Sequence, residues 1–564
     1  MRPADGRIGP LPGVRERESA TGKVFLNIRR GARGGILGDP GGMPAFAPFR
    51  RMGLTHGVRR MLLPLFVALG AAGALALAWA VSPWWWAAAA VLLALTALAV
   101  RDLAQRRHAV LRNRPLLGHL RFLLRPDDRD VRGLVYERAG GVEVEEPFGT
   151  GLDLYGDGYE YLEPSMRPVE MPDEPPVVRV GGPHCTQPYD MALLNVSAMS
   201  FGALSSHAIV ALSRGAALGG FAQDTGEGGL SDHHLRGGGD LIWEIGSGYF
   251  GCRTPEGGFE AREFADKAGL PEVKCVSLKL SQGAQPGIGG VLPGAKVSAE
   301  IARARGVPEG EAVVSPPYHR VFSTPRELVC FLARMRELAG GKPTGFKLCV
   351  GSRRQFLAVC KAMLAEGVSP DFIVVDGAEG GTGAAPPEFA ASLGTPLTEG
   401  LITVHNALVG TGLRDRVRIG ASGGVATGSD IVKRLAQGAD YTNAARAMMF
   451  ALGCLQSRRC HTNTCPVGVA TQDPRRVRAL DVADKSARVH RYQRATVRSA
   501  SRIMAAMGVR DPAELGPHQL LRRTDPATVR SYAQLYEWLE PGVLLAEAPA
   551  SWEADWKAAD PDAF

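Results

Sequence analysis

The sequence predicts an α/β protein, a (β/α)8 TIM barrel preceded by a two-helix transmembrane hairpin. Between residues 190 and 470, eight short apolar strand patterns alternate with glycine-rich loops and helix-length patterns. Ahead of them, residues 61–100 contain two uncharged apolar runs of about membrane-spanning length. A doubly wound open sheet is the alternative for residues 190–470, but no G-x-G-x-x-G turn follows its first strand.

Each barrel element is predicted by its own pattern. Strands are expected where apolar and β-branched residues form short runs, at 193–197, 221–225, 241–245, 276–280, 346–350, 372–376, 417–421 and 441–445. Helices are expected at 205–218, 326–338, 354–365 and 429–437. In such a barrel, functional residues lie where strands end at the carboxyl side.

The two apolar runs cover 61–81 and 84–100 and are joined at Ser82-Pro83. Arg50, Arg51, Arg59 and Arg60 precede them, and Arg101, Arg106 and Arg107 follow them. Basic flanks on both sides predict that both ends face the cytoplasm, with the hairpin in the cell inner membrane and the catalytic domain cytoplasmic. A signal peptide or a buried helical pair are the alternatives.

Composition limits the remaining classes. The chain of 564 residues has a formal charge of +8, but residues 1–60 hold twelve Lys or Arg against four Asp or Glu, so the rest is balanced. No nucleic-acid partner is therefore expected. Nine cysteines without framework spacing favour a reducing compartment.

The predicted domains are a disordered basic arm at 1–60, the hairpin at 61–101, a linker and pre-barrel segment at 102–184, the barrel at 185–510 and a tail at 511–564. The arm is alternatively translated from a start codon placed too early, since Met52 directly precedes the first apolar run.

Several site candidates follow from the strand positions. Gly423 and Gly424 follow the seventh predicted strand, and Ala444 lies at the end of the eighth. These loops of barrels often bind phosphate, although tight-turn glycine is the alternative. Lys279 and Lys347 lie inside apolar strands, where a buried ammonium needs an anionic partner, so a cofactor or substrate group is expected there.

Three cysteines form a second candidate site. Cys454, Cys460 and Cys465 fall within twelve residues, and a proline follows the last. Thiolates at this density predict an iron–sulfur or zinc centre.

Six longer motifs, in the same order, resemble the FMN-binding synthase domain of glutamate synthase over about residues 185–510. They are Ser197-Ala-Met-Ser-Phe-Gly-Ala-Leu-Ser205, Asp224-Thr-Gly-Glu-Gly-Gly229, the segment 279–296, Ser315-Pro-Pro-Tyr-His319, the segment 376–384 and the segment 460–472. The resemblance implies an FMN-dependent barrel that reduces 2-iminoglutarate, formed from 2-oxoglutarate and ammonia, to L-glutamate. It would thus be an oxidoreductase of the type acting on CH–NH2 donors.

The resemblance also implies cofactor sites. The residues expected at FMN are Met199 and Ser200 against the ring, Lys347 near N1/O2, and Gly423, Gly424, Ala444 and Ala445 at the phosphate. Cys454, Cys460 and Cys465 are similar to the ligands of a [3Fe-4S] cluster, which would deliver electrons to FMN; a zinc site with His461 is the alternative.

For the substrate, the resemblance matches Lys279 and Gln282 to groups that bind the 2-oxoglutarate carboxylates, with Lys296 as a further candidate. Glu227 is matched to a residue near the ammonia entry, where a carboxylate orients the nucleophile or takes its proton. The predicted catalytic residues are therefore Glu227, Lys279 and Gln282.

The chain also departs from the family pattern. Arg2 stands where the glutaminase domain of full synthases has its nucleophilic cysteine, so ammonia is expected to be free or to come from another protein. No NAD(P)-binding motif is found, so ferredoxin or a separate reductase is the expected electron donor. Gln285 stands where the family usually has lysine, and Ile288 stands where it often has glutamate.

Two other functions stay open from the sequence. One is a membrane-tethered FMN oxidoreductase acting on another 2-oxo or amino acid, and the other is a non-catalytic flavin-binding subunit.

Overall fold

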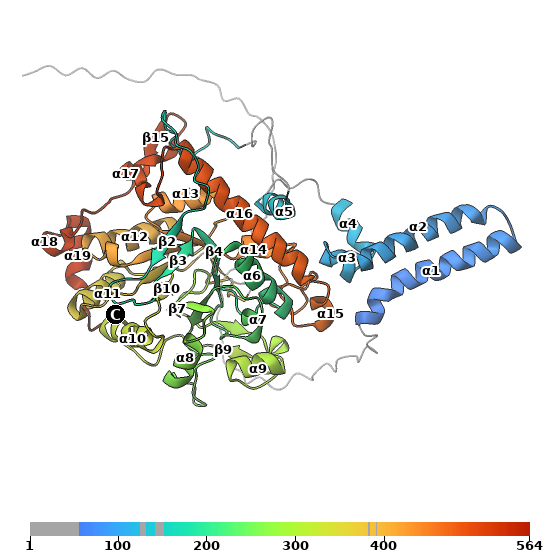
Figure 1. Cartoon of the computed structure of the whole chain (residues 1–564), viewed down its shortest axis with the longest axis horizontal. Coiled ribbons are helices and arrows are strands. Elements are labelled where there is room, and N and C mark those ends of the chain that lie inside the picture. The colour runs from blue at the N-terminus through green and yellow to red at the C-terminus, as the bar shows by residue number, and fades with distance from the viewer. Residues whose placement is uncertain (1–55, 124–130, 142–151, 382–383, 391) are drawn as a thin grey trace, which may run out of the picture. The chain divides into compact units, whose positions relative to one another are not determined.

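The computed structural model of the chain describes residues 56–123, 131–141, 152–381, 384–390 and 392–564. Of the predicted arm at 1–60, residues 1–55 lie outside the described residues, and residues 56–60 are helical. Within the described chain, eight parallel strands close into a barrel in sequence order (Figure 1). The strands are β4 (Leu194–Val196), β5 (Gln223–Asp224), β6 (Leu241–Ile245), β7 (Val273–Lys279), β10 (Thr344–Leu348), β11 (Phe372–Asp376), β12 (Arg418–Ser422) and β13 (Tyr441–Ala444). The predicted barrel is confirmed, and the open sheet is excluded.

Helices follow the strands and cover the outside of the barrel. They are α6 (Ser206–Gly219), α7 (Asp232–Leu235), α8 (Ala261–Ala268), α10 (Pro325–Leu338), α11 (Arg353–Glu366), α12 (Leu397–Gly410), α13 (Gly428–Ala436), α14 (Arg446–Ala451), α15 (Pro474–Val477) and α16 (Val482–Ala506). Their starts have local causes: Thr324 and Glu327 form a capping box at α10, and Thr427 and Asp430 form one at α13.

The strands are apolar because both of their faces are covered. All five residues of β11 are buried, as in sheets packed on both sides. One interior cluster joins Ile242, Phe372 and Tyr441 from three barrel strands to Val180 and Met191. The latter two come from an antiparallel hairpin, β2 (Val177–Val180) and β3 (Tyr189–Ala192), which precedes β4. This hairpin therefore packs against the apolar part of the barrel interior.

A long excursion separates β7 from β10 and contains the segment expected to bind 2-oxoglutarate. Its elements are β8 (Val291–Leu292), η1 (Gly294–Lys296), α9 (Ala299–Arg305), β9 (Val313–Val314) and then α10. Because β8 and β9 pair antiparallel, the excursion is a folded unit at the carboxyl end of β7.

The segment after residue 510 folds onto the barrel. Strands β14 (Leu520–Asp525) and β15 (Thr528–Ser531) form a sheet with β1 (Glu160–Leu162). Arg353 on α11 pairs with Asp555 on α19 at 2.6 Å. The remaining elements here are η3 (Pro512–Glu514), η4 (Pro517–Gln519), α17 (Tyr532–Leu535), α18 (Val543–Ala546) and α19 (Ala550–Ala558), with η2 (Arg414–Arg416) before β12.

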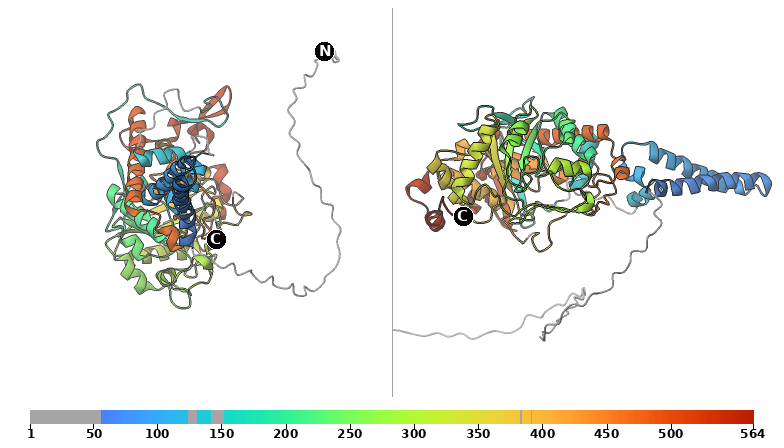
Figure 2. Two further views of the ribbon diagram at one scale, coloured as in Figure 1. Left: turned by 90° about the vertical axis from the view of Figure 1, so that its right-hand side faces the viewer. Right: turned by 90° about the horizontal axis from the view of Figure 1, so that it is seen from below.

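Two long apolar helices lie antiparallel to each other, α1 (His56–Ala80) and α2 (Trp85–Ala104) (Figures 1 and 2). Within them, Met61–Ala80 and Trp85–Ala104 are long and apolar enough to cross a membrane. Large apolar side chains on both are exposed, among them Phe66 and Trp79 on α1 and Trp86 on α2. Three short helices follow, α3 (Ala109–Asn113), α4 (Leu117–Leu123) and α5 (Val131–Gly140).

Candidate active site

The carboxyl ends of the barrel strands carry a group of buried ionised side chains. Lys279 ends β7 and Lys347 lies in β10, and the two residues are directly opposite each other in the register. The Lys279 Nζ donates to Glu227 Oε1 at 2.8 Å, and Lys347 forms an ion pair with Glu244 of β6. Both lysines therefore have the anionic partners that burial demands, supplied by the protein itself.

Glu227 is held by its neighbours in one position. Ser315 Oγ donates to its Oε2 at 3.4 Å, and a methyl group on Gly290 would lie 1.9 Å from its Oε1. Burial raises the pKa of Glu227, but Lys279, Arg305 and other cations outweigh burial, so the pKa falls below its usual value. The carboxylate is therefore ionised at neutral pH beside the Lys279 ammonium.

Two further buried carboxyl groups act electrostatically on Lys347. Asp224 accepts from the Gly226 N–H at 2.9 Å, and Asp376 accepts from the Gly283 N–H at 3.0 Å. Burial, with Glu244 nearby, raises the pKa of Asp224 to about 8, and burial also raises the pKa of Asp376. Burial lowers the pKa of Lys347, but Glu244 and the two aspartates outweigh it and the pKa is raised, so Lys347 stays charged.

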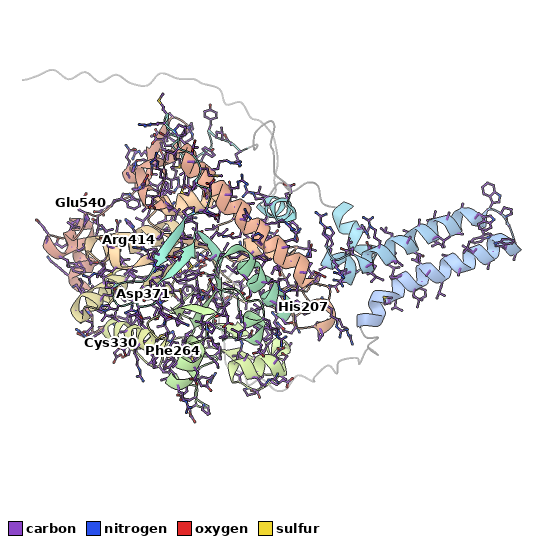
Figure 3. All side chains as sticks on the ribbon, in the orientation of Figure 1. His207, Phe264, Cys330, Asp371, Arg414 and Glu540 are labelled. Carbon is purple, nitrogen blue, oxygen red and sulfur yellow. The ribbon has the colours of Figure 1, made fainter. Side chains whose placement is uncertain are left out.

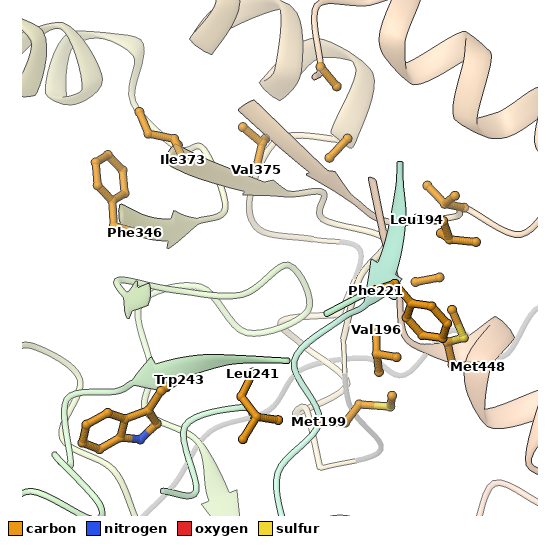
Figure 4. Packing of buried hydrophobic residues seen from close by; sticks show 14 of the residues in the cluster. Leu194, Val196, Met199, Phe221, Leu241, Trp243, Phe346, Ile373, Val375 and Met448 are labelled. Carbon is orange, nitrogen blue, oxygen red and sulfur yellow. The ribbon is translucent and has the colours of Figure 1, made fainter. Parts of the chain in front are cut away.

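The residues expected at the flavin ring lie in the loop after β4. Met199 is buried and follows Val196 at the end of this strand (Figure 4). A methyl group on Gly226 would lie 2.7 Å from the Ser200 backbone N, and Gly226 has φ +66°. The loop of Glu227 therefore packs directly against the Met199–Ser200 loop, which brings these two predicted groups together.

The residues expected at the phosphate are also adjacent to one another. Gly423 and Gly424 have φ values of +138° and +66°, a conformation that side chains with Cβ rarely adopt. Ser422 Oγ lies 3.2 Å from Ser197 Oγ, and the Ser197 N–H donates to the Ala444 carbonyl at 3.1 Å. Ala445 follows directly and precedes α14. The ends of β4, β12 and β13 thus lie side by side, and they carry the residues expected at the phosphate.

The other two substrate candidates lie in different surroundings. Gln282 lies three residues beyond Lys279, and its carbonyl accepts from the Gln285 N–H at 3.3 Å. Lys296 instead donates to the carbonyls of Ala203 and Cys460 at 2.8 and 2.9 Å. Its contacts connect the loop after β4 to residues 454–465, called here the cysteine segment. They differ from the contacts of the Lys279–Glu227 pair.

The cysteine segment follows α14 and contacts η1, where Asn463 Nδ2 donates to the Ala295 carbonyl at 2.8 Å. Cys465 is buried, whereas Cys454 and Cys460 are partly exposed. Among the described residues, no three His, Cys, Asp or Glu side chains are grouped as metal ligands. Three residues of this segment that are not glycine, Gln456, Arg458 and Asn463, have φ between +53° and +57°.

The segment after α2 lies against this cysteine segment. Asn113 Nδ2 donates to the Pro466 carbonyl at 2.8 Å, and Lys485 Nζ of α16 donates to the Arg107 carbonyl at 2.7 Å. The residues that follow the apolar helix pair are thus fixed beside Cys465 by hydrogen bonds.

Sequence reasoning missed the acidic partners Glu244, Asp224 and Asp376 as site residues. The signal was present, because Glu244 is the charged residue within the predicted strand 241–245. It also missed His319 as a packing group: its Nε2 lies 2.9 Å from the Lys279 carbonyl, and burial lowers the pKa of His319 to about 4.

An eight-stranded parallel barrel with ionised residues at the carboxyl ends of its strands defines a TIM-barrel enzyme. A family model described as the conserved region in glutamate synthase matches residues 184–510. The chain belongs to the glutamate synthase family and is an oxidoreductase of that type, and this membership supports FMN as its cofactor.

Individual relatives agree with this assignment. The glutamate synthase large subunit-like protein YerD of Bacillus subtilis is 35% identical over 76% of this chain and 93% of its own length. The archaeal glutamate synthase [NADPH] of Methanocaldococcus jannaschii is 34% identical over 56% of this chain and 58% of its own length. Among solved structures, a flavocytochrome b2 mutant with pyruvate bound has TM-score 0.41 and 14% identity, covering 77% of this chain and 96% of that chain.

Proposed function

We propose that the chain reduces 2-iminoglutarate, formed from 2-oxoglutarate and ammonia, to L-glutamate, using electrons from a partner such as ferredoxin or a separate reductase. The observation that carries this proposal is the Lys279–Glu227 pair at the carboxyl end of the barrel, next to the Met199–Ser200 loop. It supplies a cation for a substrate carboxylate and a carboxylate for the nitrogen nucleophile.

The proposed cofactor site is the surface formed by Met199, Ser200 and the turns after β12 and β13. The backbone conformations of Gly423 and Gly424 leave room for a phosphate group, because no atom lies within 4 Å of a methyl group built on Gly424. Bound there, FMN would supply hydride transfer.

The chain's own residues then divide the remaining work. Lys279 holds a substrate carboxylate, and Gln282 offers its amide three residues further along the same loop. Glu227 is ionised at neutral pH, so it orients ammonia and would accept the proton that the nitrogen loses as it adds to the keto carbon of 2-oxoglutarate. Arg305, which contacts Ser200 Oγ at 3.3 Å, keeps positive charge near this carboxylate.

The proposed iron–sulfur site uses Cys454, Cys460 and Cys465 as ligands of a [3Fe-4S] cluster. The left-handed backbone at Gln456 and Arg458 supports a loop shaped around a bound group, because such conformations cost free energy and persist where the surroundings hold them. Thiolates are the ligands that iron–sulfur clusters use.

The proposed location is the cell inner membrane, with α1 and α2 as a hairpin across the bilayer and the barrel in the cytoplasm. The length of the two apolar stretches and the exposure of Phe66 and Leu69 support this. In carbonate-washed membranes, the full chain is expected in the pellet, and a Phe66→Glu/Leu69→Glu variant in the supernatant. A full chain released by carbonate contradicts the proposal.

A second candidate function is reduction of a different 2-oxo acid at the same site. Gln285 favours it, because its side-chain oxygen is buried without a hydrogen-bond partner, in the segment expected to bind the substrate. The amide of Gln285 would bind a different substrate group from the one that the ammonium of the family's usual lysine would bind.

One experiment tests both candidates. Anaerobic protein carrying FMN is mixed with 2-oxoglutarate and ammonium under reducing conditions, and glutamate and the flavin spectrum are followed. Glutamate is expected from the wild type and from Glu263→Gln, an exposed residue of α8, and at least about tenfold less from Glu227→Gln. Flavin-loaded protein that neither forms glutamate nor changes spectrum with 2-oxoglutarate rejects this substrate.

A further inference from the structure

The ammonium of Lys347 is enclosed by protein carboxyl groups. Glu244 of β6 forms a direct ion pair with it, while Asp224 of β5 and Asp376 of β11 act on it electrostatically. Glu244 is 1% exposed and Lys347 is 4% exposed, so the pair is almost fully shielded from water. The sequence suggests that the Lys347 ammonium is available to a flavin. In the structure this ammonium already has a fixed counter-charge, the Glu244 carboxylate.

The pair lies inside the barrel, above its apolar layer. Side chains alternate along a strand, so Ile242 and Glu244 share one face of β6. Ile242 belongs to the interior cluster with Phe372 and Val374, so Glu244 also faces the interior, two residues closer to the carboxyl end. Lys347 is opposite Lys279, whose ammonium reaches Glu227 of the active-site loop.

We propose that Glu244 is a positioning residue that sets the electron affinity of the flavin by neutralising Lys347. A free ammonium near N1 and O2 stabilises the negative charge that reduction places there. With Glu244 paired to it, the net charge of the two groups is zero, so the reduced flavin gains less stabilisation. This inference deepens the proposed function and rests on FMN binding at the carboxyl end of the barrel strands.

The inference has a specific mutational signature. Glu244→Gln keeps the shape and removes the counter-charge, so an anionic flavin adduct is stabilised. Lys347→Met removes the cation and has the opposite effect. Because the two charges add, the double variant again has a net charge of zero and is expected to return toward the wild-type affinity, whereas the second substitution would not reverse a general change in packing.

Sulfite provides the readout, because it adds to N5 of oxidised flavin and leaves negative charge at N1 and O2. In the full chain with bound FMN, Glu244→Gln is expected to bind sulfite about tenfold more tightly, and its midpoint potential is expected to become more positive. Lys347→Met should bind sulfite more weakly, and the double variant should lie close to the wild type.

Asp240→Asn is the matched control. Asp240 lies just before β6, four residues from Glu244, and its carboxylate accepts from Tyr189 Oη at 3.0 Å. At about 3.3 Å per residue this charge lies roughly 13 Å toward the opposite end of the barrel. Its removal should change sulfite affinity by less than about twofold.

The outcomes separate the two proposals. Flavin-loaded Glu244→Gln with unchanged or weaker sulfite binding overturns the role of Glu244 alone, as does a double variant that binds sulfite as tightly as Glu244→Gln. A purified wild type without FMN overturns the proposed function as well. If Glu244→Gln does not fold, Glu244→Asp gives the test, because its shorter side chain lengthens the ion pair and should tighten sulfite binding by a smaller factor.

Discussion

The substitution Lys279→Met removes the partner of a carboxylate that cannot reach solvent easily. Lys279 Nζ donates to Glu227 Oε1 at 2.8 Å, and the side chains are 8% and 15% exposed. Removing one member of a fully buried pair costs about 3–5 kcal/mol, and partial exposure at the barrel mouth reduces this to roughly 2–3 kcal/mol. We expect the free energy of unfolding to fall by this amount at neutral pH.

The cost should depend on pH with a defined sign. In the wild type the pKa of Glu227 is lowered in the folded state, so its contribution to stability is present above its unfolded pKa and is lost as pH falls. Without Lys279, burial dominates and the folded pKa rises, so stability is lost as pH rises instead. The difference between variant and wild type should therefore grow between about pH 5 and about pH 8.

Urea unfolding of the full chain at these two pH values measures the difference. Lys274→Met is the control, because Lys274 lies on the same strand but its pair with Asp240 is 3.6 Å long and partly exposed. We expect its cost to stay below about 1 kcal/mol. The reasoning is refuted if Lys279→Met costs no more than the control, or if its cost shrinks as pH rises.

Three further predictions concern the turn, the barrel base and the cysteines. Gly424→Ala should cost about 1–2 kcal/mol in urea unfolding because its φ is +66° while no atom obstructs a methyl group, and it should loosen FMN in equilibrium dialysis. Asp371, labelled in Figure 3, is a buried carboxylate that accepts from Arg336 Nε and two backbone amides, so Asp371→Asn should cost about 3–5 kcal/mol in the same unfolding assay. Cys465→Ser should lower the iron and sulfide bound per chain in anaerobically purified protein.

Each of these predictions has a control and a contradicting outcome. Gly351→Ala has equally open space without a positive φ, so equal losses in Gly351→Ala and Gly424→Ala would show that backbone strain is not the cause. Asp190 forms an exposed pair with Arg179, and a loss at Asp371 as small as at Asp190→Asn would contradict the buried-pair argument. Cys360→Ser, remote from the cysteine segment in sequence, should keep its iron, and iron retained in Cys465→Ser would exclude that residue as a ligand.

The sequence alone determined the barrel, and it placed the candidate site at the carboxyl ends of the barrel strands. Its eight apolar runs correspond to the eight strands because a strand covered on both faces requires an unbroken run of apolar residues. The same reasoning located Lys279 and Lys347, since a lysine in such a run has to be paired. The sequence also predicted the apolar stretches of α1 and α2, because the run of uncharged residues sets their length.

Only the tertiary structure decided which groups pair. Glu244 and Lys347 are about a hundred residues apart in sequence, and their contact exists because β6 and β10 each flank β7 in the closed barrel. Lys296 is similar: the resemblance to glutamate synthase suggests that it shares a ligand with Lys279, but η1 directs its ammonium to the Ala203 and Cys460 carbonyls. Sequence patterns report whether a residue is buried, whereas the identity of its partner depends on how strands far apart in the chain are brought together.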